Sequence, residues 1–443
     1  MTDRNQRYLL QSGGWWALYD GLTAGYLLAY ALALGASNTI IGIIGALPYL
    51  AMMLAEIPGA KLLEHFTRLR IYAIASTFAR LSWLGIIFAP SIFAQSPLLG
   101  VVLFFFLARF FDYMSDPAWT VLVADVVPNR IRGDFVARRT RLINIGGMIA
   151  LVAAGQYLDL FAPGDFAGFL TVFAVGIGFG IATTLCTLKV KEPPYQDHDH
   201  HGWREFFQLE GEFKRYVTFA FLFNFAFMLA SPFFTAYILN DLGLSYTIFA
   251  LSTALTNITK ILVFRHVGKL SDRFGDKPVL WLSVIGTALV PLTFLFVTRD
   301  TLWLLWFAQV LSGIVWAGYD VAVFNVFLDL TTPSKRAIQT ATYSIITGVP
   351  LIIAPILGGF IADNVTLVLT GIPLVFAVSA VLRLLSSLFL VGIREHRVKH
   401  DYPLAEVLWH AFELHPSRGI QHRWHGIVRG MRKKALLFTT VFK

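Results

Sequence analysis

The chain has 443 residues, of which 56% are hydrophobic and 14% are charged, and its mean hydropathy is +0.64. Because soluble domains carry about 25% charged residues, this composition excludes a soluble globular protein and indicates a chain that crosses a membrane several times. The formal net charge of +9 raises nucleic-acid binding as a function, but the distribution of the basic residues, described below, argues against a nucleic-acid partner.

Apolar runs of helix length recur from one end of the chain to the other. Crossing roughly 30 Å of hydrocarbon takes about 20 helical residues, and twelve segments meet that length. The predicted spans are 8–33, 37–59, 71–92, 97–124, 136–158, 166–188, 215–238, 246–266, 278–298, 301–328, 339–362 and 366–392. We therefore predict an all-α polytopic membrane protein with 12 transmembrane helices.

The Lys and Arg residues between these spans predict the orientation. Twelve crossings place both termini on one side, and the loops of the other side carry only Arg299. The basic side carries Arg4, Arg7, Lys61, Arg68, Arg70, Arg130, Arg132, Arg138, Arg139, Arg141, Lys189, Lys191, Lys214, Arg215, Lys269, Arg273, Lys277, Lys335, Arg336 and a basic tail. Under the positive-inside rule both termini are cytoplasmic, and we expect a plasma (inner) membrane location. The opening residues, MTDRNQRYLLQSGGWW, lack the apolar core and cleavage site of a signal peptide.

The second half of the chain repeats the first. The segment GKLSDRFGDK at 268–277 has a blurred copy, AKLLEHFTRL, at 60–69. An offset of 204 residues pairs Asp125 with Asp329, Gly155 with Gly359, Asp159 with Asp363 and Asp116 with Asp320. Six helices per half give both halves the same orientation, so we predict two six-helix bundles related by a pseudo-two-fold axis along the membrane normal.

These boundaries divide the chain into four parts. The first bundle is predicted at 1–189 and the second at 215–392, joined by a polar cytoplasmic linker at 190–214. The run DHDHH at 197–201 lies in that linker and is interpreted as a solvated loop, so we expect no metal site. The tail at 393–443 mixes apolar and basic residues and is predicted to lie on the anionic lipids of the inner leaflet, with a regulatory or partner-binding tail as the alternative.

Three motifs carry a resemblance to a known family. GKLSDRFGDK at 268–277, DVVPNRIRG at 125–133 and APILGG at 354–359 resemble, respectively, the loop signature, the helix 4–5 loop and an antiporter element of major facilitator superfamily transporters. The resemblance implies alternating access to a substrate held between the two bundles, in a cavity lined by helices 1, 4, 7 and 10.

The same resemblance implies a gating loop on the basic side. Its residues are Gly268, Asp272, Arg273, Gly275 and Lys277 in the better copy and Glu64 in the weaker one. Gly268 would allow close helix approach and Gly275 a tight turn. The alternative is a charged hairpin that only fixes the topology.

The predicted fourth span carries three charged residues on one face. Arg109, Asp112 and Asp116 are spaced i, i+3 and i+7. Each charge at mid-membrane costs about 2.5–3.5 kcal/mol on insertion scales, so these side chains must face the protein interior, pair, or border a water-filled cavity. We expect Arg109 to bridge to Asp112, which leaves Asp116 as the freer acid for substrate or proton handling. A structural ion pair between helices is the alternative.

The predicted tenth span carries the repeat partner of Asp116. Asp320 lies beside Trp316 and Tyr319, and two acids at equivalent depth would form a negative site for a cation or a proton. The two aromatic rings would form a wall suited to organic cations. The alternative is an Asp320 that is simply bonded to a neighbouring hydroxyl or amide.

Other polar residues lie at membrane depth on the remaining spans. Asp20 in the first span and Asn224 in the seventh are further candidates for the substrate and proton-coupling site. Arg80, Lys260 and Arg383 are interpreted as structurally paired or as snorkelling to the membrane surface.

The sequence has no signal for catalysis. It contains no phosphate-binding glycine motif, its only cysteine is Cys186, and no catalytic constellation lies at depth, so we expect no enzyme activity and no cofactor. We predict a monomeric, proton-coupled secondary transporter of a small organic solute, with efflux of an amphipathic or cationic compound favoured. The alternatives are a proton symporter or uniporter for a small nutrient and, in another class, a transporter-like receptor or assembly factor without flux.

Overall fold

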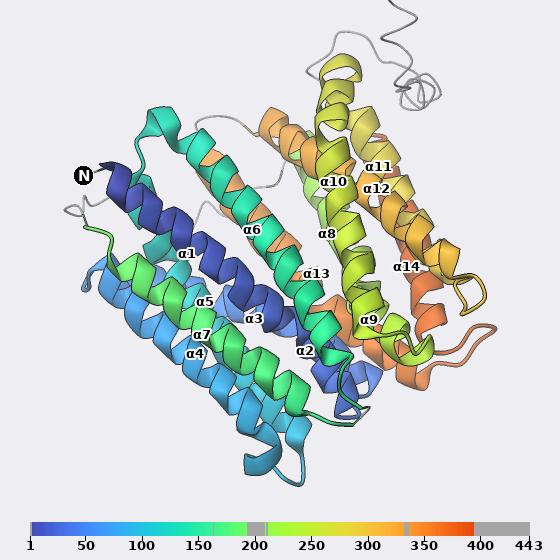
Figure 1. The fold of residues 1–443 in the computed structure, drawn as a ribbon. Coiled ribbons are helices and arrows are strands. Elements are labelled where there is room, and N and C mark those ends of the chain that lie inside the picture. The colour runs from blue at the N-terminus through green and yellow to red at the C-terminus, as the bar shows by residue number, and fades with distance from the viewer. Residues whose placement is uncertain (1, 163, 193–208, 210, 332–335, 394–443) are drawn as a thin grey trace, which may run out of the picture.

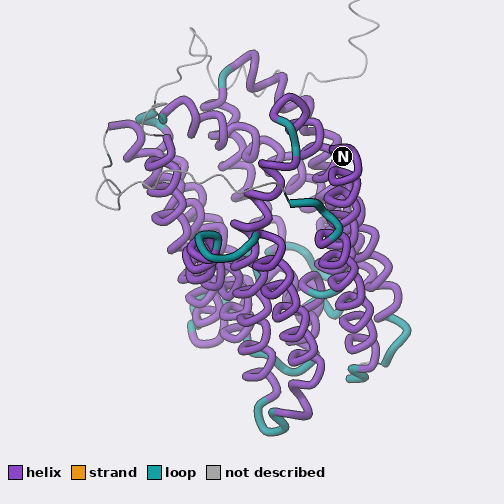
Figure 2. Tube along the Cα trace, turned by 90° about the vertical axis from the view of Figure 1, so that its left-hand side faces the viewer, coloured by secondary structure: helices purple, strands orange, loops and turns teal. Residues whose placement is uncertain are grey.

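The computed structural model describes residues 2–162, 164–192, 209, 211–331 and 336–393. Figure 2 shows this part of the chain almost entirely as helix joined by short loops. Its one departure into extended pairing is an isolated bridge between Thr366 and Thr370. The predicted all-α class is therefore confirmed. Most of the predicted linker and tail, with the DHDHH run, lies outside the described residues.

The described residues of the first half form seven helices. They are α1 (Thr2–Leu22), α2 (Ala24–Ala33), α3 (Asn38–Leu62), α4 (Arg68–Ile92), α5 (Pro97–Val126), α6 (Asn129–Leu158) and α7 (Ala167–Leu188). In Figure 1, α1 and α2 follow one another beside α6 and α7, so the predicted span 8–33 is two helices interrupted at Thr23. The Thr23 hydroxyl donates to the Tyr19 carbonyl at 2.6 Å at this interruption.

The second half repeats this arrangement. Its helices are α8 (Gly211–Ala230), α9 (Phe233–Ala236), the π-helical η2 (Tyr237–Asp241), α10 (Tyr246–Phe274), α11 (Asp276–Phe294), α12 (Leu302–Leu330), α13 (Arg336–Asn364), α14 (Gly371–Ser387) and the 3₁₀ helix η3 (Leu388–Leu390). Eleven helices of the described chain are long and apolar enough to cross a membrane. The predicted first span is not among these, because α1 is on average too polar and α2 has only 10 residues.

The charged segment at 268–277 is not the hairpin that the sequence suggested. Residues up to Phe274 continue α10, and only Gly275 separates α10 from α11. Gly275 has a φ of +93°, a conformation that favours glycine, so the tight turn expected there is confirmed. α10 continues through these charged residues because their side chains can extend into water while the backbone keeps its helical hydrogen bonds. Among the described residues, no atom lies within 4 Å of a Cβ placed at Gly268, so the close helix approach expected there is not found between them.

The two halves meet at one end and separate at the other. We call the end that carries the N-terminus and Gly275 the basic end, and the other the far end. A buried apolar core that includes Tyr26 and Ile41 of the first half and Phe233 and Phe249 of the second is continuous between the halves. Toward the basic end each half has its own core. Figure 1 accordingly shows α6 and α10 converging at the far end and diverging toward the N-terminus.

Glycines bring backbones into contact at the far end. α3 packs on α13, and α6 packs on α10. A Cβ at Gly42 of α3 would clash with the Pro355 carbonyl of α13, and one at Gly155 of α6 would lie 2.7 Å from the Tyr246 carbonyl of α10. Small residues permit this close packing between membrane helices. Pro355 belongs to the APILGG motif, which therefore serves the contact between the halves.

Two carboxylates complete the far-end contact. Asp159, at the end of α6, accepts hydrogen bonds from the backbone nitrogens of Tyr246 at 2.8 Å and Thr247 at 2.9 Å. Asp363, near the end of α13, accepts from the backbone nitrogens of Asn38 at 3.2 Å and Thr39 at 2.7 Å. Each carboxylate thus meets the first turn of a helix in the other half, where backbone N–H groups and the helix dipole favour negative charge. We call these two contacts the far-end caps.

Candidate functional site

A polar cavity of about 430 Å³ lies within the first half. Its walls come from six helices and contain three arginines and three acids. The lining residues are Ser12, Trp16, Glu56, Tyr72, Ser76, Arg80, Arg109, Asp112, Tyr113, Ser115, Asp116, Trp119, Thr120, Arg139, Ile143 and Thr183. So many charged groups at membrane depth are tolerated where they pair or border such a cavity.

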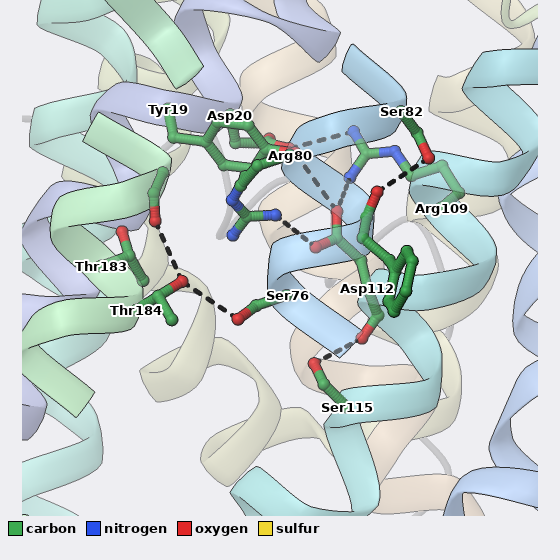
Figure 3. Close-up of polar contacts among 12 residues, drawn as sticks. Tyr19, Asp20, Ser76, Arg80, Ser82, Arg109, Asp112, Ser115, Thr183 and Thr184 are labelled. Carbon is green, nitrogen blue, oxygen red and sulfur yellow. Dashed lines mark hydrogen bonds and ion pairs between the residues drawn. The ribbon is translucent and has the colours of Figure 1, made fainter. Parts of the chain in front are cut away.

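Asp112 of α5 lies at the centre of an ion-pair network. Arg80 of α4 donates to its carboxylate at 2.6 Å, and Arg109 approaches it at 3.8 Å. Arg109 also pairs with Asp20 of α1 at 3.0 Å. Figure 3 shows the two guanidinium groups approaching Asp112 from different sides. The bridge predicted between Arg109 and Asp112 is present, and Asp20 is a second acid on the same arginine.

The packing around Arg80 fixes the position of this network. Arg80 is only 5% exposed, and its guanidinium carbon lies 3.9 Å from the ring centroid of Tyr19. A Cβ at Gly180 of α7 would lie 2.5 Å from the Arg80 Nε, so the glycine provides space for the guanidinium. Arg80 is thus structurally paired, one of the two roles interpreted for it.

Asp116 differs from the other acids of this network. Among the described residues it has no hydrogen bond or ion pair, and its side chain is exposed on the cavity wall. Glu56 and Arg139 line the same cavity, and the Arg139 guanidinium lies 4.2 Å from the ring centroid of Trp119. Among the described residues, Asp116 and Glu56 are therefore the acids of this cavity whose protonation would break no ion pair, and Asp116 is the one on the same helix as Arg109 and Asp112.

The second half holds its predicted residues in a different arrangement. Asp320 of α12 forms an ion pair with Lys260 of α10, a partner that sequence reasoning did not identify. Asn224 of α8 donates to the Thr347 carbonyl at 3.1 Å. The Trp316 and Tyr319 rings lie 5.3 Å apart. The two are in contact, as an aromatic wall requires, but Tyr319 is buried against Phe223 rather than open to a cavity.

At the basic end, the buried charges differ from the predicted gating residues. Glu64, Asp272 and Arg273 are exposed, and Lys277 donates to the Val391 carbonyl at 3.4 Å. The buried charged residue of each motif copy is instead the one at its ninth position. In the first copy this is Arg68, which pairs with Asp125 and Glu192. In the second copy it is Asp276, which is hydrogen-bonded to Ser271 and Asn325. The alignment of the two copies could have identified both residues, because both copies have a charged residue at the ninth position, basic in the first copy and acidic in the second.

Replacing Arg80 with Leu is expected to destabilise the protein by about 3–5 kcal/mol, because it leaves the largely buried Asp112 without its closest cation. The double variant Arg80→Leu/Asp112→Leu should lose less, since both members of the pair are removed together. Chemical denaturation of the detergent-solubilised protein measures both effects.

The exposed pair between Arg138 and Asp134 provides the control. Arg138→Leu should change the stability by about 1 kcal/mol or less. A double Arg80/Asp112 variant that is less stable than Arg80→Leu would contradict the proposed pairing.

Sequence comparison places this arrangement in a family. The model of the Major Facilitator Superfamily matches residues 9–219 and 216–442. The class B tetracycline resistance protein of Escherichia coli is 37% identical over 115 residues, which are 26% of this chain and 28% of that protein. The uncharacterised MFS-type transporter YitZ of Bacillus subtilis strain 168 is 29% identical over 168 residues, 38% of this chain and 97% of that protein. The matched segment thus spans less than a third of the tetracycline resistance protein.

Solved structures share the fold at low identity. A mutant of the nucleoside transporter NupG has a TM-score of 0.74 at 16% identity, over 88% of this chain and 100% of that one. A D-xylose–proton symporter has a TM-score of 0.68 at 15% identity, over 89% of this chain and 97% of that one. The solved structures thus share the fold, and the match of the family model to nearly the whole chain shows that the protein belongs to the Major Facilitator Superfamily.

Proposed function

We propose that this protein is a proton-coupled exporter of a small amphipathic organic compound and that Asp116 carries the coupled proton. The observation that carries this proposal is a contrast along one helix: Asp112 is held by Arg80 and Arg109, whereas Asp116, one turn further on and lining the same cavity, has no ion pair among the described residues. Protonating a paired acid removes the negative charge that attracts its arginine and so loses the ion pair. Protonating Asp116 changes the charge of the cavity wall without the loss of an ion pair.

Alternating access supplies the second element of the mechanism. In this conformation the halves touch at the far end, through the far-end caps and the glycine contacts, and separate toward the basic end. The positive-inside rule supports assigning the basic end to the cytoplasm, in a plasma (inner) membrane. We infer that this is the inward-open state, and that protonation of Asp116 biases the equilibrium between it and an outward-open state.

Two observations support export of an amphipathic compound. Segments of the chain are 37% and 35% identical to the class B and class H tetracycline resistance proteins of Escherichia coli and Pasteurella multocida. The second half offers the Trp316 ring, which lines a cavity there, as apolar contact surface. The sequence predicted a cation site formed by Asp116 and Asp320, but Asp320 is neutralised by its ion pair with Lys260. We therefore propose an amphipathic substrate that need not be a cation.

One chain is proposed to be the working unit. Both far-end caps join the two halves of the same chain, so opening and closing need no second copy. We also propose that this unit consists of the four parts predicted from the sequence, which are two bundles, a linker and a tail. The tail is proposed to contact lipids of the inner leaflet.

Transport across a reconstituted membrane tests this function. Proteoliposomes are given an imposed pH gradient, and movement of tetracycline and of other amphipathic compounds is followed. The proposal expects accumulation on the side with the higher proton concentration, since protons and substrate exchange. Accumulation on the opposite side would indicate symport. The absence of flux for every compound, with a protein partner bound to the tail, would favour the receptor or assembly factor.

A further inference from the structure

Arg383 of α14 is a buried cation whose partners in the described part of the chain are all neutral. It is 2% exposed and donates to Ser379 Oγ at 3.1 Å, to the Thr287 carbonyl at 2.7 Å and to the Phe227 carbonyl at 3.5 Å. A guanidinium has five N–H donors, so two of them lack an acceptor among the described residues. Among the described residues Arg383 is held by hydrogen bonds to neighbouring helices and pairs with no acid, and at 2% exposure it does not snorkel to the surface.

Comparison with Arg80 in the first half shows which partner Arg383 lacks. Arg80 lies between α4 and α7, the third and sixth spans of its half, and Arg383 bridges α14 and α11, the sixth and third spans of the other. The offset of 204 residues that pairs Asp116 with Asp320 also pairs Asp112 with Trp316. The two halves therefore place a guanidinium between equivalent helices, but an indole replaces the acid that neutralises it in the first half.

Arg383 and Trp316 line the same cavity. The cavity has a volume of about 260 Å³ and lies within the second half. Aromatic and aliphatic side chains line half of it, and the other half is lined by Arg383 and the neutral polar residues Thr235, Thr253, Thr256, Asn257, Gln309 and Ser312. The ring of Phe227 lies between the two, 5.6 Å from the Arg383 guanidinium carbon and 4.7 Å from the Trp316 ring centroid. The space thus combines aromatic rings and neutral polar groups with one positive charge that has no acidic partner among the described residues, and such convergence of polar groups with apolar surface is typical of ligand sites.

We propose that this cavity binds the anionic group of an amphipathic aromatic compound, with Arg383 as the residue that recognises the charge. A buried charge without a counter-ion is costly, and in a membrane protein a ligand can supply that counter-ion. A carboxylate or an ionised hydroxyl can accept the two remaining N–H donors. The inference rests on the proposed transport of an amphipathic compound and adds the sign of its charge.

Binding of three matched probes to the purified full-length protein tests this site without any gradient. The probes are 2-naphthoate, its neutral amide 2-naphthamide and the cation 2-naphthylmethylammonium, and isothermal titration gives their affinities. The wild-type protein should bind the acid about tenfold more tightly than the amide, and the cation most weakly. Arg383→Gln should remove the preference for the acid, whereas the exposed-surface control Arg138→Gln should keep it.

A second variant covers the case in which Arg383→Gln does not fold. Trp316→Asp introduces into the cavity the acid that the first half has at the equivalent position, and it should also abolish the preference. Equal affinity for acid and amide in the wild type, no binding of the acid, or a preference that survives Trp316→Asp or a folded Arg383→Gln overturns the proposal. These results do not depend on proton coupling, so the loss of gradient-driven transport alone would instead count against the proposed function.

Discussion

Replacing both Asp159 and Asp363 with Asn is expected to open the far end of the protein. Each carboxylate accepts backbone N–H bonds at the first turn of a helix in the other half, where a negative charge also interacts with the helix dipole. An amide keeps an acceptor but loses the charge, which we estimate to cost about 1–2 kcal/mol per site. Two sites together should therefore shift the equilibrium toward the outward-open state by roughly 30- to 700-fold.

Spin labels at the far end measure this shift. Cysteines replace Leu160 in the first half and Leu367 in the second, both highly exposed, with Cys186→Ser as the background. The distribution of distances between the two labels should move to longer values in the double Asn variant.

Asp165 offers a matched control at the same end. Its carboxylate accepts from the Ala167 backbone nitrogen at 2.9 Å within the first half, so Asp165→Asn removes a similar bond without separating the halves. A double Asn variant whose distances equal those of Asp165→Asn would contradict the role of the far-end caps.

Replacing Asp116 with Asn is expected to abolish pH-gradient-driven transport while leaving substrate exchange in place. The amide is similar in size to the acid but does not bind and release a proton in the transport cycle. Because Asp116 has no ion pair among the described residues, its neutralisation should disturb the fold little. Gradient-driven accumulation should fall at least tenfold, and exchange at equal pH on both sides should stay within about twofold of the wild type, limits that correspond to about 1.4 and 0.4 kcal/mol.

Two further variants make this result specific. Asp134→Asn changes an exposed acid of α6 and should alter neither activity. Asp112→Asn should reduce both activities, since it leaves the buried Arg80 without its acid. An Asp116→Asn protein that still accumulates substrate along a pH gradient would refute the assignment.

The sequence predicts the fold well because hydropathy and charge act over whole spans. The predicted ranges fall on the observed helices, and the departures occur where local chemistry decides. Gly275 ends α10 later than the charged residues suggested, and Thr23 interrupts the first span. The last helix, α14, begins at Gly371 rather than at 366 because residues 366 and 370 form a bridge instead.

The site is less predictable, since it depends on which helices pack together. Spacing along one helix was enough to expect the contact between Arg109 and Asp112 and to leave Asp116 without that partner. The partners of Arg80 and Lys260 lie on other helices and follow only from the packing. The internal repeat paired Asp159 with Asp363 but did not indicate that each meets a helix of the other half.

The proton itself provides the most direct test of the central claim. With a pH-sensitive dye inside proteoliposomes that lack an initial pH gradient, an imposed substrate gradient should drive protons in the opposite direction through the wild-type protein. In Asp116→Asn the same substrate gradient should produce no change in internal pH although the substrate still crosses. Proton movement at the wild-type rate in that variant would contradict the account.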